Sequence, residues 1–169
     1  MGFWKQITSV LLTLLFGSAA MVASAEDAAD TTGKILFICE HGNVKSLMAV
    51  SYFNKIAQER HLPFVAVSRG IVPDSITVPP PIVDGLRQEG FDVAAFHPTK
   101  LTALDIDSAR RAIAISVDSP ISIGSNGSSI LAWNDVPPAS VDFKASSASL
   151  KAHIEALLTQ LTAQSGQSK

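Results

Sequence analysis

The sequence contains one cysteine in 169 residues, so it cannot form an intramolecular disulfide. Only 17% of the residues are charged, the formal net charge is −2, and lysine and arginine form no long cluster. Nucleic-acid-binding domains usually carry such a basic cluster, so no nucleic-acid partner is expected. The chain also lacks an internal repeat and any sign of a second folded domain. Its hydrophobic content of 47% suits a single globular core.

The first 25 residues have the features of a secretory signal peptide. Lys5 gives a positive start, Ile7 to Phe16 form a short apolar core, and Ala23-Ser24-Ala25 matches an A-x-A cleavage site. Because the apolar core is short for a membrane anchor, we expect cleavage and no stable membrane span in the mature protein. Removal of 25 of the 169 residues leaves 144. The expected location is periplasmic or secreted, an oxidising environment in which a lone thiol is chemically exposed.

The rest of the sequence is organised around residues 34–46. Apolar Ile35 to Cys39 predict a short strand that is buried on both faces, and a helical pattern begins at about Val44. Cys39 therefore lies at the carboxyl end of a strand and just before a helix N-terminus, where open α/β sheets bind ligands. A helix N-terminus offers N–H donors to an anion and favours the thiolate form of a nearby cysteine. A buried structural cysteine is the alternative, but this placement favours a nucleophile.

The remaining segments predict strands and helices in alternation. Strands are expected at residues 34–39, 64–68, 111–117 and 131–133, and helices at 44–60, 79–90, 102–109 and 146–162. The third helix has a capping box, Thr102 with Asp105, at its start. This order predicts an α/β fold with three αβα layers and a four-stranded parallel sheet. One domain is expected at 34–163, between a flexible N-terminus at 26–33 and a disordered tail at 164–169.

Residues 39–46 read C-E-H-G-N-V-K-S. This stretch resembles the phosphate loop of the low-molecular-weight protein tyrosine phosphatases and the related arsenate reductases, in which five residues separate the cysteine from an arginine and a serine. Lys45 stands where the family has the arginine. The matching loop residues are Cys39, Gly42, Asn43 and Ser46, and weaker matches follow in order at 68–70, 85–92 and 133–143.

The resemblance implies a similar fold and a phosphate monoester or inorganic oxyanion as the ligand. It implies a cysteinyl-phosphate intermediate on Cys39 and Asp135 as the general acid. Asp118, at the carboxyl end of the predicted third strand, is the alternative acid. Lys45 is the only basic residue within the loop and is the expected phosphate clamp. Backbone N–H groups of the loop are expected to bind the substrate, at Glu40, His41, Gly42, Asn43, Val44 and Ser46.

Two departures from the family pattern leave other functions open. Lysine offers one compact charge where arginine holds two oxygens, and Glu40 adds an acid beside an anion site. The protein is therefore either a phosphatase or an oxyanion-binding module without turnover. An arsenate reductase that uses an external thiol is a further alternative, since the chain has no second cysteine.

The sequence gives weaker expectations about other ligands. No cofactor and no metal are expected, because the histidines lack metal-ligand spacing. His41 is also weighed as a proton carrier, and Arg69 as a speculative source of the missing guanidinium. The substrate and the oligomeric state are not predicted.

Overall fold

The structure is a computed structural model that describes residues 33–117 and 130–166. The predicted signal peptide and Asp118 lie outside the described residues. The elements of the described part are β1 (Gly33–Cys39), α1 (Lys45–Glu59), β2 (Phe64–Gly70), α2 (Pro80–Gln88), α3 (Ala103–Asp107), β3 (Arg111–Ile115), β4 (Ile130–Trp133) and α4 (Phe143–Gly166).

The four strands form one parallel sheet in the order β2-β1-β3-β4. Strand β1 lies inside the sheet, where Ile35 pairs with Ala66 of β2 on one side and with Arg111 of β3 on the other. The side chains from Ile35 to Ile38 are fully buried, which explains why the strand is a continuous apolar run rather than an alternating one. The predicted four-stranded parallel αβα fold is confirmed.

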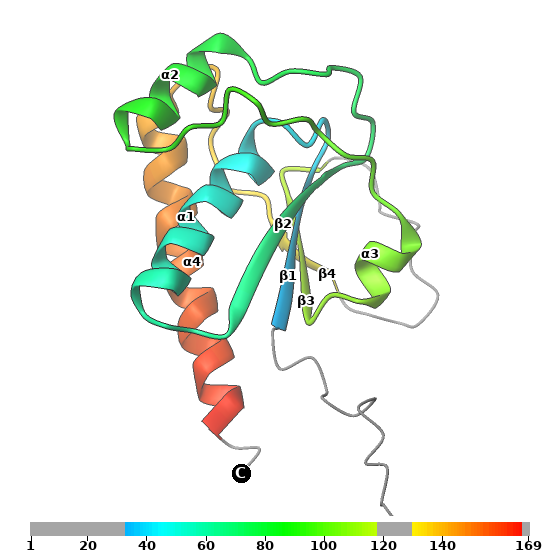
Figure 1. Cartoon of the computed structure of the whole chain (residues 1–169), viewed down its shortest axis with the longest axis vertical. Helices are drawn as coiled ribbons and strands as arrows, with labels where there is room; N and C mark the ends of the chain where they lie inside the picture. Colours follow the sequence, from blue (N-terminus) through cyan, green and yellow to red (C-terminus); the bar gives the residue numbers. More distant parts are fainter. Residues whose placement is uncertain (1–32, 118–129, 167–169) are drawn as a thin grey trace, which may run out of the picture.

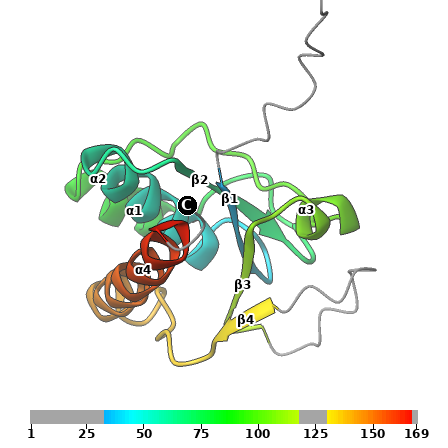
Figure 2. The ribbon, with the colours of Figure 1, turned by 90° about the horizontal axis from the view of Figure 1, so that it is seen from below.

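Helices cover both faces of the sheet unequally. Helices α1, α2 and α4 lie on one face and the short α3 lies on the other (Figures 1 and 2). Successive residues of β1 contribute to the two layers, as the alternation of a strand requires. Ile35 and Phe37 belong to the larger core with α1 and α4, whereas Leu36 and Ile38 pack with Ile106 of α3. The carboxyl ends of β1 and β3 thus meet at one edge, beside the start of α1.

Helix α4 is longer than the sequence predicted. It begins at Phe143 rather than at residue 146 and continues to Gly166 rather than to residue 162. Asp142 explains the early start: its Oδ1 accepts the backbone N–H of Ala145 at 2.9 Å, and its carbonyl accepts that of Ser146 at 3.1 Å. The helix therefore extends into the segment that was expected to be a disordered tail.

Two strand ends also differ from the prediction. Strand β2 continues beyond residue 68 because Gly70 pairs with Cys39 and also bridges to Lys100. Strand β3 ends at Ile115 rather than at residue 117, because Ser116 has a positive φ of 47° that leaves the extended conformation. The capping box predicted for Thr102 and Asp105 is present at the start of α3.

Candidate functional site

The loop after β1 folds tightly against the end of β2. Gly42 has a φ of +77°, and a Cβ atom there would lie 2.6 Å from the backbone nitrogen of Gly70. A Cβ atom on Gly70 would in turn lie 2.7 Å from the carbonyl carbon and oxygen of His41. Both glycines are therefore required for this close approach of two backbones. The contact bends the loop so that its amides turn back toward Cys39.

The sulfur of Cys39 is held by two polar contacts within this loop. The backbone N–H of Gly42 donates to Sγ at 3.3 Å, and the hydroxyl of Ser46 lies 2.9 Å from Sγ. Ser46 is fully buried in the first turn of α1, and only 6% of Cys39 is exposed. These two contacts fix the position of the sulfur in the loop. Ser46, one of the loop residues matched in the sequence, thus contacts the sulfur directly.

A second serine supports this pair from the neighbouring strand. The hydroxyl of Ser68 lies 2.9 Å from the carbonyl of Gly42 and 2.8 Å from the hydroxyl of Ser46, and its one proton can be donated to either. When Ser68 donates to Ser46, the proton of Ser46 is directed to the sulfur. Ser68 was not among the residues predicted for the site. Its strand register, opposite Phe37 near the carboxyl end of β1, is the signal that places it there.

The start of α1 offers hydrogen-bond donors that no side chain satisfies. Its N-cap is Val44, which forms no side-chain cap, and the first turn contains no acidic residue. Among the described residues, the backbone N–H groups of Asn43 and Val44 have no hydrogen-bond acceptor. The side-chain amide of Asn43 donates instead to the carbonyl of Thr77 at 2.8 Å, which fixes the loop. Such a set of open donors at a helix N-terminus is suited to a bound anion.

A pocket of about 290 Å³ opens beside the sulfur. Its walls come from the loop after β1, the first turns of α2, the end of β3 and residues 138–140. Of the predicted site residues, those that line it are Cys39, Glu40, His41, Asn43, Val44 and Lys45. Gly42 and Ser46 are not part of the lining, and they contact the sulfur directly.

Lys45 connects the two loops that border the pocket. Its ammonium group donates to the carbonyl of Val136 at 3.2 Å, and the hydroxyl of Ser116 donates to the same carbonyl at 3.3 Å. The position of Lys45 in the lining fits the predicted clamp.

Asp135 does not line the pocket. Its Oδ1 accepts a hydrogen bond from Nε2 of His153 at 2.8 Å, and 72% of its side chain is exposed. The His153 ring stacks on Trp133, with centroids 4.7 Å apart. The hydrogen bond from His153 lowers the pKa of the Asp135 carboxyl below its ordinary value. A general acid must carry a proton, so this environment does not favour the predicted role.

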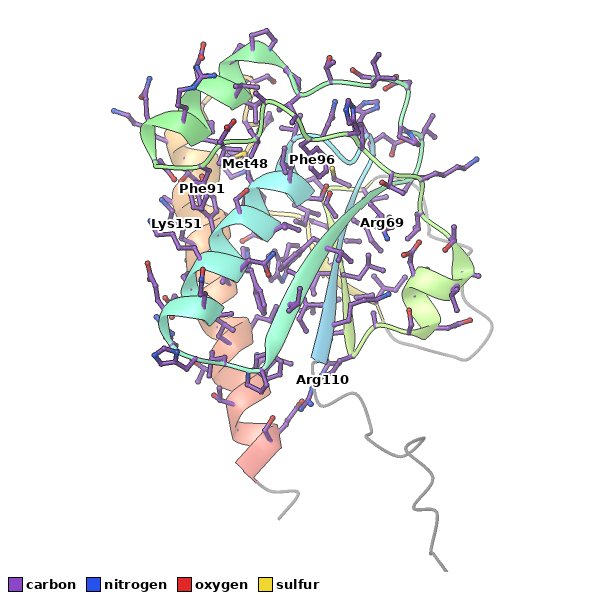
Figure 3. All side chains as sticks on the ribbon, in the orientation of Figure 1. Met48, Arg69, Phe91, Phe96, Arg110 and Lys151 are labelled. Atoms are coloured by element: carbon purple, nitrogen blue, oxygen red, sulfur yellow. The ribbon has the colours of Figure 1, made fainter. Side chains whose placement is uncertain are left out.

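Arg69 points away from the anion-binding loop. Its Nε and Nη2 atoms lie 3.0 Å and 2.9 Å from Oδ1 of Asp105, on the side of the sheet that carries α3 (Figure 3). Burial opposes ionisation of Asp105, but hydrogen bonds from Thr102 and Arg69 outweigh it and lower the pKa of this carboxyl. The idea that Arg69 supplies a guanidinium to the loop is therefore wrong.

Two further features are absent from residues 33–117 and 130–166. No group of three or more His, Cys, Asp or Glu side chains is placed to hold a metal ion in these ranges. No helix within them is both long enough and apolar enough to span a membrane.

Several solved structures have the same fold as this chain. The Bacillus subtilis protein YfkJ has a TM-score of 0.63 and 21% identity, over 79% of this chain and 96% of that one. The thioredoxin-dependent arsenate reductase of Corynebacterium glutamicum has a TM-score of 0.65 and 18% identity, over 79% of this chain and 63% of that one. A low-molecular-weight protein tyrosine phosphatase from T. tengcongensis has a TM-score of 0.60 and 20% identity, over 76% and 99%.

Comparisons of the sequence itself give no such match. No protein-family model matches the chain, and no curated protein matches it either. The similarity to the solved structures therefore concerns the fold. The chain has the fold of low-molecular-weight protein tyrosine phosphatases and arsenate reductases.

Proposed function

We propose that this protein binds a tetrahedral oxyanion in the loop of residues 39–46 and hydrolyses phosphate monoesters through a cysteinyl-phosphate intermediate on Cys39. The observation that carries the proposal is the environment of the sulfur. It accepts a hydrogen bond from Gly42 and contacts Ser46, beside a pocket that is lined by Asn43 and Val44, whose backbone N–H groups have no acceptor among the described residues. The fold neighbours support it, since an arsenate reductase and a tyrosine phosphatase are among them.

Each part of the loop has a role in this proposal. The open amides bind the phosphoryl oxygens, and the ammonium group of Lys45 offsets part of their charge. The Cys39 thiolate attacks phosphorus from the side opposite the leaving oxygen, so that a sulfur–phosphorus bond forms as the ester bond breaks. Lysine in place of the family's arginine lacks the planar pair of donors. Loss of one oriented donor typically costs about 100- to 1000-fold in rate, so we expect a slow enzyme.

Hydrolysis of an aryl phosphate by wild type and by Cys39→Ser tests the proposal. The serine hydroxyl occupies the same place but is a far weaker nucleophile at neutral pH, so the rate should fall by about 10,000-fold or more. Circular dichroism and thermal unfolding of both proteins check that the fold is retained. Equal rates for the two folded proteins would show that the proposed chemistry is wrong.

Oxyanion binding without turnover is the second candidate. It is favoured by the position of Asp135, which pairs with His153 instead of lining the pocket. Calorimetry with phosphate, arsenate and sulfate measures binding independently of hydrolysis. Tight binding with no hydrolysis would support this candidate, and arsenate-dependent oxidation of an added thiol would instead support an external-thiol arsenate reductase.

We further propose that the protein acts outside the cytoplasm. The support is the sequence of residues 1–25, with Lys5, an apolar core and Ala23-Ser24-Ala25. Sequencing of the mature N-terminus after expression in a bacterial host should find Glu26 first. A retained Met1 in the cell-soluble fraction would contradict export.

A further inference from the structure

A phosphate monoester needs a proton for its departing oxygen unless the leaving group is already a stable anion. Asp135 does not line the pocket, so a different group is needed if the site hydrolyses ordinary esters. Among the described lining residues, the ionisable side chains other than the nucleophile Cys39 are Glu40, His41 and Lys45. Lys45 is the expected clamp for the phosphate. Among the residues that the structure describes, Glu40 and His41 are therefore the two candidates for the acid.

His41 has the arrangement of an oriented acid–base group. Its Nδ1 lies 2.9 Å from Oδ1 of Asp74 and 3.3 Å from the carbonyl of Val72. Both neighbours are acceptors, so Nδ1 carries a hydrogen and donates it. Nε2 forms no hydrogen bond within the described part of the chain. This is the arrangement in which a carboxylate fixes the tautomer of an imidazole and leaves the second nitrogen for proton transfer.

The backbone holds both members of this pair in place. The ladder between β1 and β2 continues past the strands, with Ile71 N–H donating to the carbonyl of Cys39 at 3.2 Å and Val72 N–H to that of Glu40 at 2.9 Å. Asp74 N–H then donates to the carbonyl of Val72 at 2.9 Å. This turn of the backbone leaves the Asp74 side chain in contact with His41. The backbone of His41 is also held by its close approach to the backbone of Gly70.

Cys39 and His41 differ in solvent exposure, as the nucleophile and the acid of an in-line displacement should. Only 6% of Cys39 is exposed, whereas the side chain of His41 is 49% exposed at the edge of the same pocket. In-line attack requires the leaving oxygen to lie on the far side of phosphorus from the sulfur. His41 lines the same pocket and is closer to solvent than the sulfur, as a group on that side of phosphorus must be.

We propose that His41 is the catalytic acid and base of this site and that Asp74 is its positioning residue, an inference that rests on the phosphate-monoester hydrolysis proposed above. In the first step the Cys39 thiolate forms a bond to phosphorus, and the ester oxygen leaves with its electron pair. Protonated His41 gives its Nε2 hydrogen to that oxygen and becomes neutral. In the second step water attacks phosphorus, Nε2 of His41 takes the water proton, and the sulfur leaves as a thiolate. The products are an alcohol or phenol and inorganic phosphate, and His41 regains its starting charge.

A pair of substrates that differ in leaving group tests the proposal. Phenyl phosphate needs a proton at its leaving oxygen, whereas 2,4-dinitrophenyl phosphate releases a stable anion without one. We expect His41→Gln to lower kcat for phenyl phosphate by about 100-fold or more and to change kcat for the dinitrophenyl ester much less. Asp74→Asn should show the same selectivity with a smaller loss, about 10-fold.

Two further variants separate a catalytic role from a structural one. His97→Gln is the matched control, because His97 is also a loop histidine whose Nδ1 contacts a backbone carbonyl, that of Ile76 at 2.9 Å, but it does not line the pocket. It should leave both substrates unaffected. Glu40→Gln tests the rival donor. Inhibition by inorganic phosphate should be unchanged in His41→Gln, since the anion-binding amides are intact.

Each outcome decides a different claim. Equal losses on both substrates in His41→Gln, or no loss, would overturn the role of His41. A selective loss of phenyl phosphate hydrolysis in Glu40→Gln, with none in His41→Gln, would assign the proton transfer to Glu40 instead. Unchanged hydrolysis by Cys39→Ser would refute the proposed function itself, whatever the histidine variants do.

Discussion

Two loops border the same pocket, but they are held in place in different ways. The loop after β1 is fixed by backbone packing at Gly42 and Gly70 and by the buried hydroxyls of Ser46 and Ser68. The loop after β4 is held mainly by side chains, including the exposed pair of Asp135 with His153. The first loop directs the Gly42 N–H to the sulfur, whereas the second places the carboxylates of Asp135 and Asp142 next to α4.

This difference separates the two halves of the proposed reaction. Binding of the anion and attack by sulfur depend on residues close together in sequence, which the backbone itself positions. Delivery of a proton in the proposed reaction depends in addition on a contact between distant residues, that of His41 with Asp74. Both the nucleophile and the proposed acid thus come from the first loop.

Among variants of the two loops that keep the nucleophile, Gly42→Ala is expected to have the largest effect. The new Cβ would lie 2.6 Å from the Gly70 nitrogen, at a residue whose φ of +77° already disfavours side chains. The loop must shift, so several anion donors are displaced together. We expect kcat/KM for an aryl phosphate to fall by about 1000-fold. Urea unfolding should show a loss of about 2–3 kcal/mol in unfolding free energy.

Gly90→Ala is the matched control for this change. Gly90 has a similar φ of +87°, but a Cβ there has nothing within 4 Å. Its cost should be the conformational term alone, about 1 kcal/mol, with activity unchanged. Equal activity in the two variants would contradict the view that backbone packing sets the first loop.

Substitution of Lys45 is expected to have the next largest effect, because this residue links the two loops. Lys45→Ala removes the cation and should lower kcat/KM by about 100-fold. Lys45→Arg restores a planar donor pair and should raise it, by about 10-fold. Both are measured with the same aryl phosphate.

Ser116→Ala distinguishes the two functions of Lys45. It removes the other hydrogen bond to the carbonyl of Val136 and leaves the cation in place. A loss of about fivefold or less is expected, since one neutral hydrogen bond contributes about 1 kcal/mol. A loss as large as that of Lys45→Ala would mean that Lys45 acts by holding the second loop and not by binding phosphate.

Asp135→Asn should change activity little, within about threefold for phenyl phosphate, because Asp135 lies outside the pocket lining. Steady-state kinetics with phenyl phosphate and 2,4-dinitrophenyl phosphate check this. A selective loss of about 100-fold on phenyl phosphate would show that the acid comes from the loop after β4 and not from the loop after β1.

The smallest effect concerns stability at low pH. His153 lowers the pKa of Asp135 in the folded protein, so the ionised carboxyl favours folding above its unfolded pKa of about 4. This contribution is lost as the pH falls through the lower, folded value. Thermal unfolding between about pH 6 and pH 3 should therefore show a slightly steeper loss of Tm for wild type than for Asp135→Asn. Identical slopes would mean that the pair does not help to hold the second loop.

The strand, loop and helix around Cys39 were predictable because their signals are local. A continuous apolar run, a glycine in the turn and a helical pattern all occur within residues 34–60. The contact of Ser46 with the sulfur follows from the same short segment. The capping box of Thr102 and Asp105 was likewise encoded within four consecutive residues.

The predictions that failed or changed depend on contacts between distant parts of the chain. Alternation along β2 sends Ser68 toward the anion loop and Arg69 toward α3, but the sequence alone does not say which residue faces which side. The pairing of Asp135 with His153 depends on how α4 packs beside β4. Asp74 meets His41 only because the ladder of β1 and β2 extends past both strands.

The most direct test of the central claim is whether phosphate becomes covalently attached to Cys39. Wild type is mixed with 2,4-dinitrophenyl phosphate, quenched in acid within the first turnover, digested and analysed by mass spectrometry. The account predicts one phosphoryl group on the peptide that contains Cys39, and none in Cys39→Ser. Steady hydrolysis with no phosphoryl group on that peptide at any quench time would contradict it.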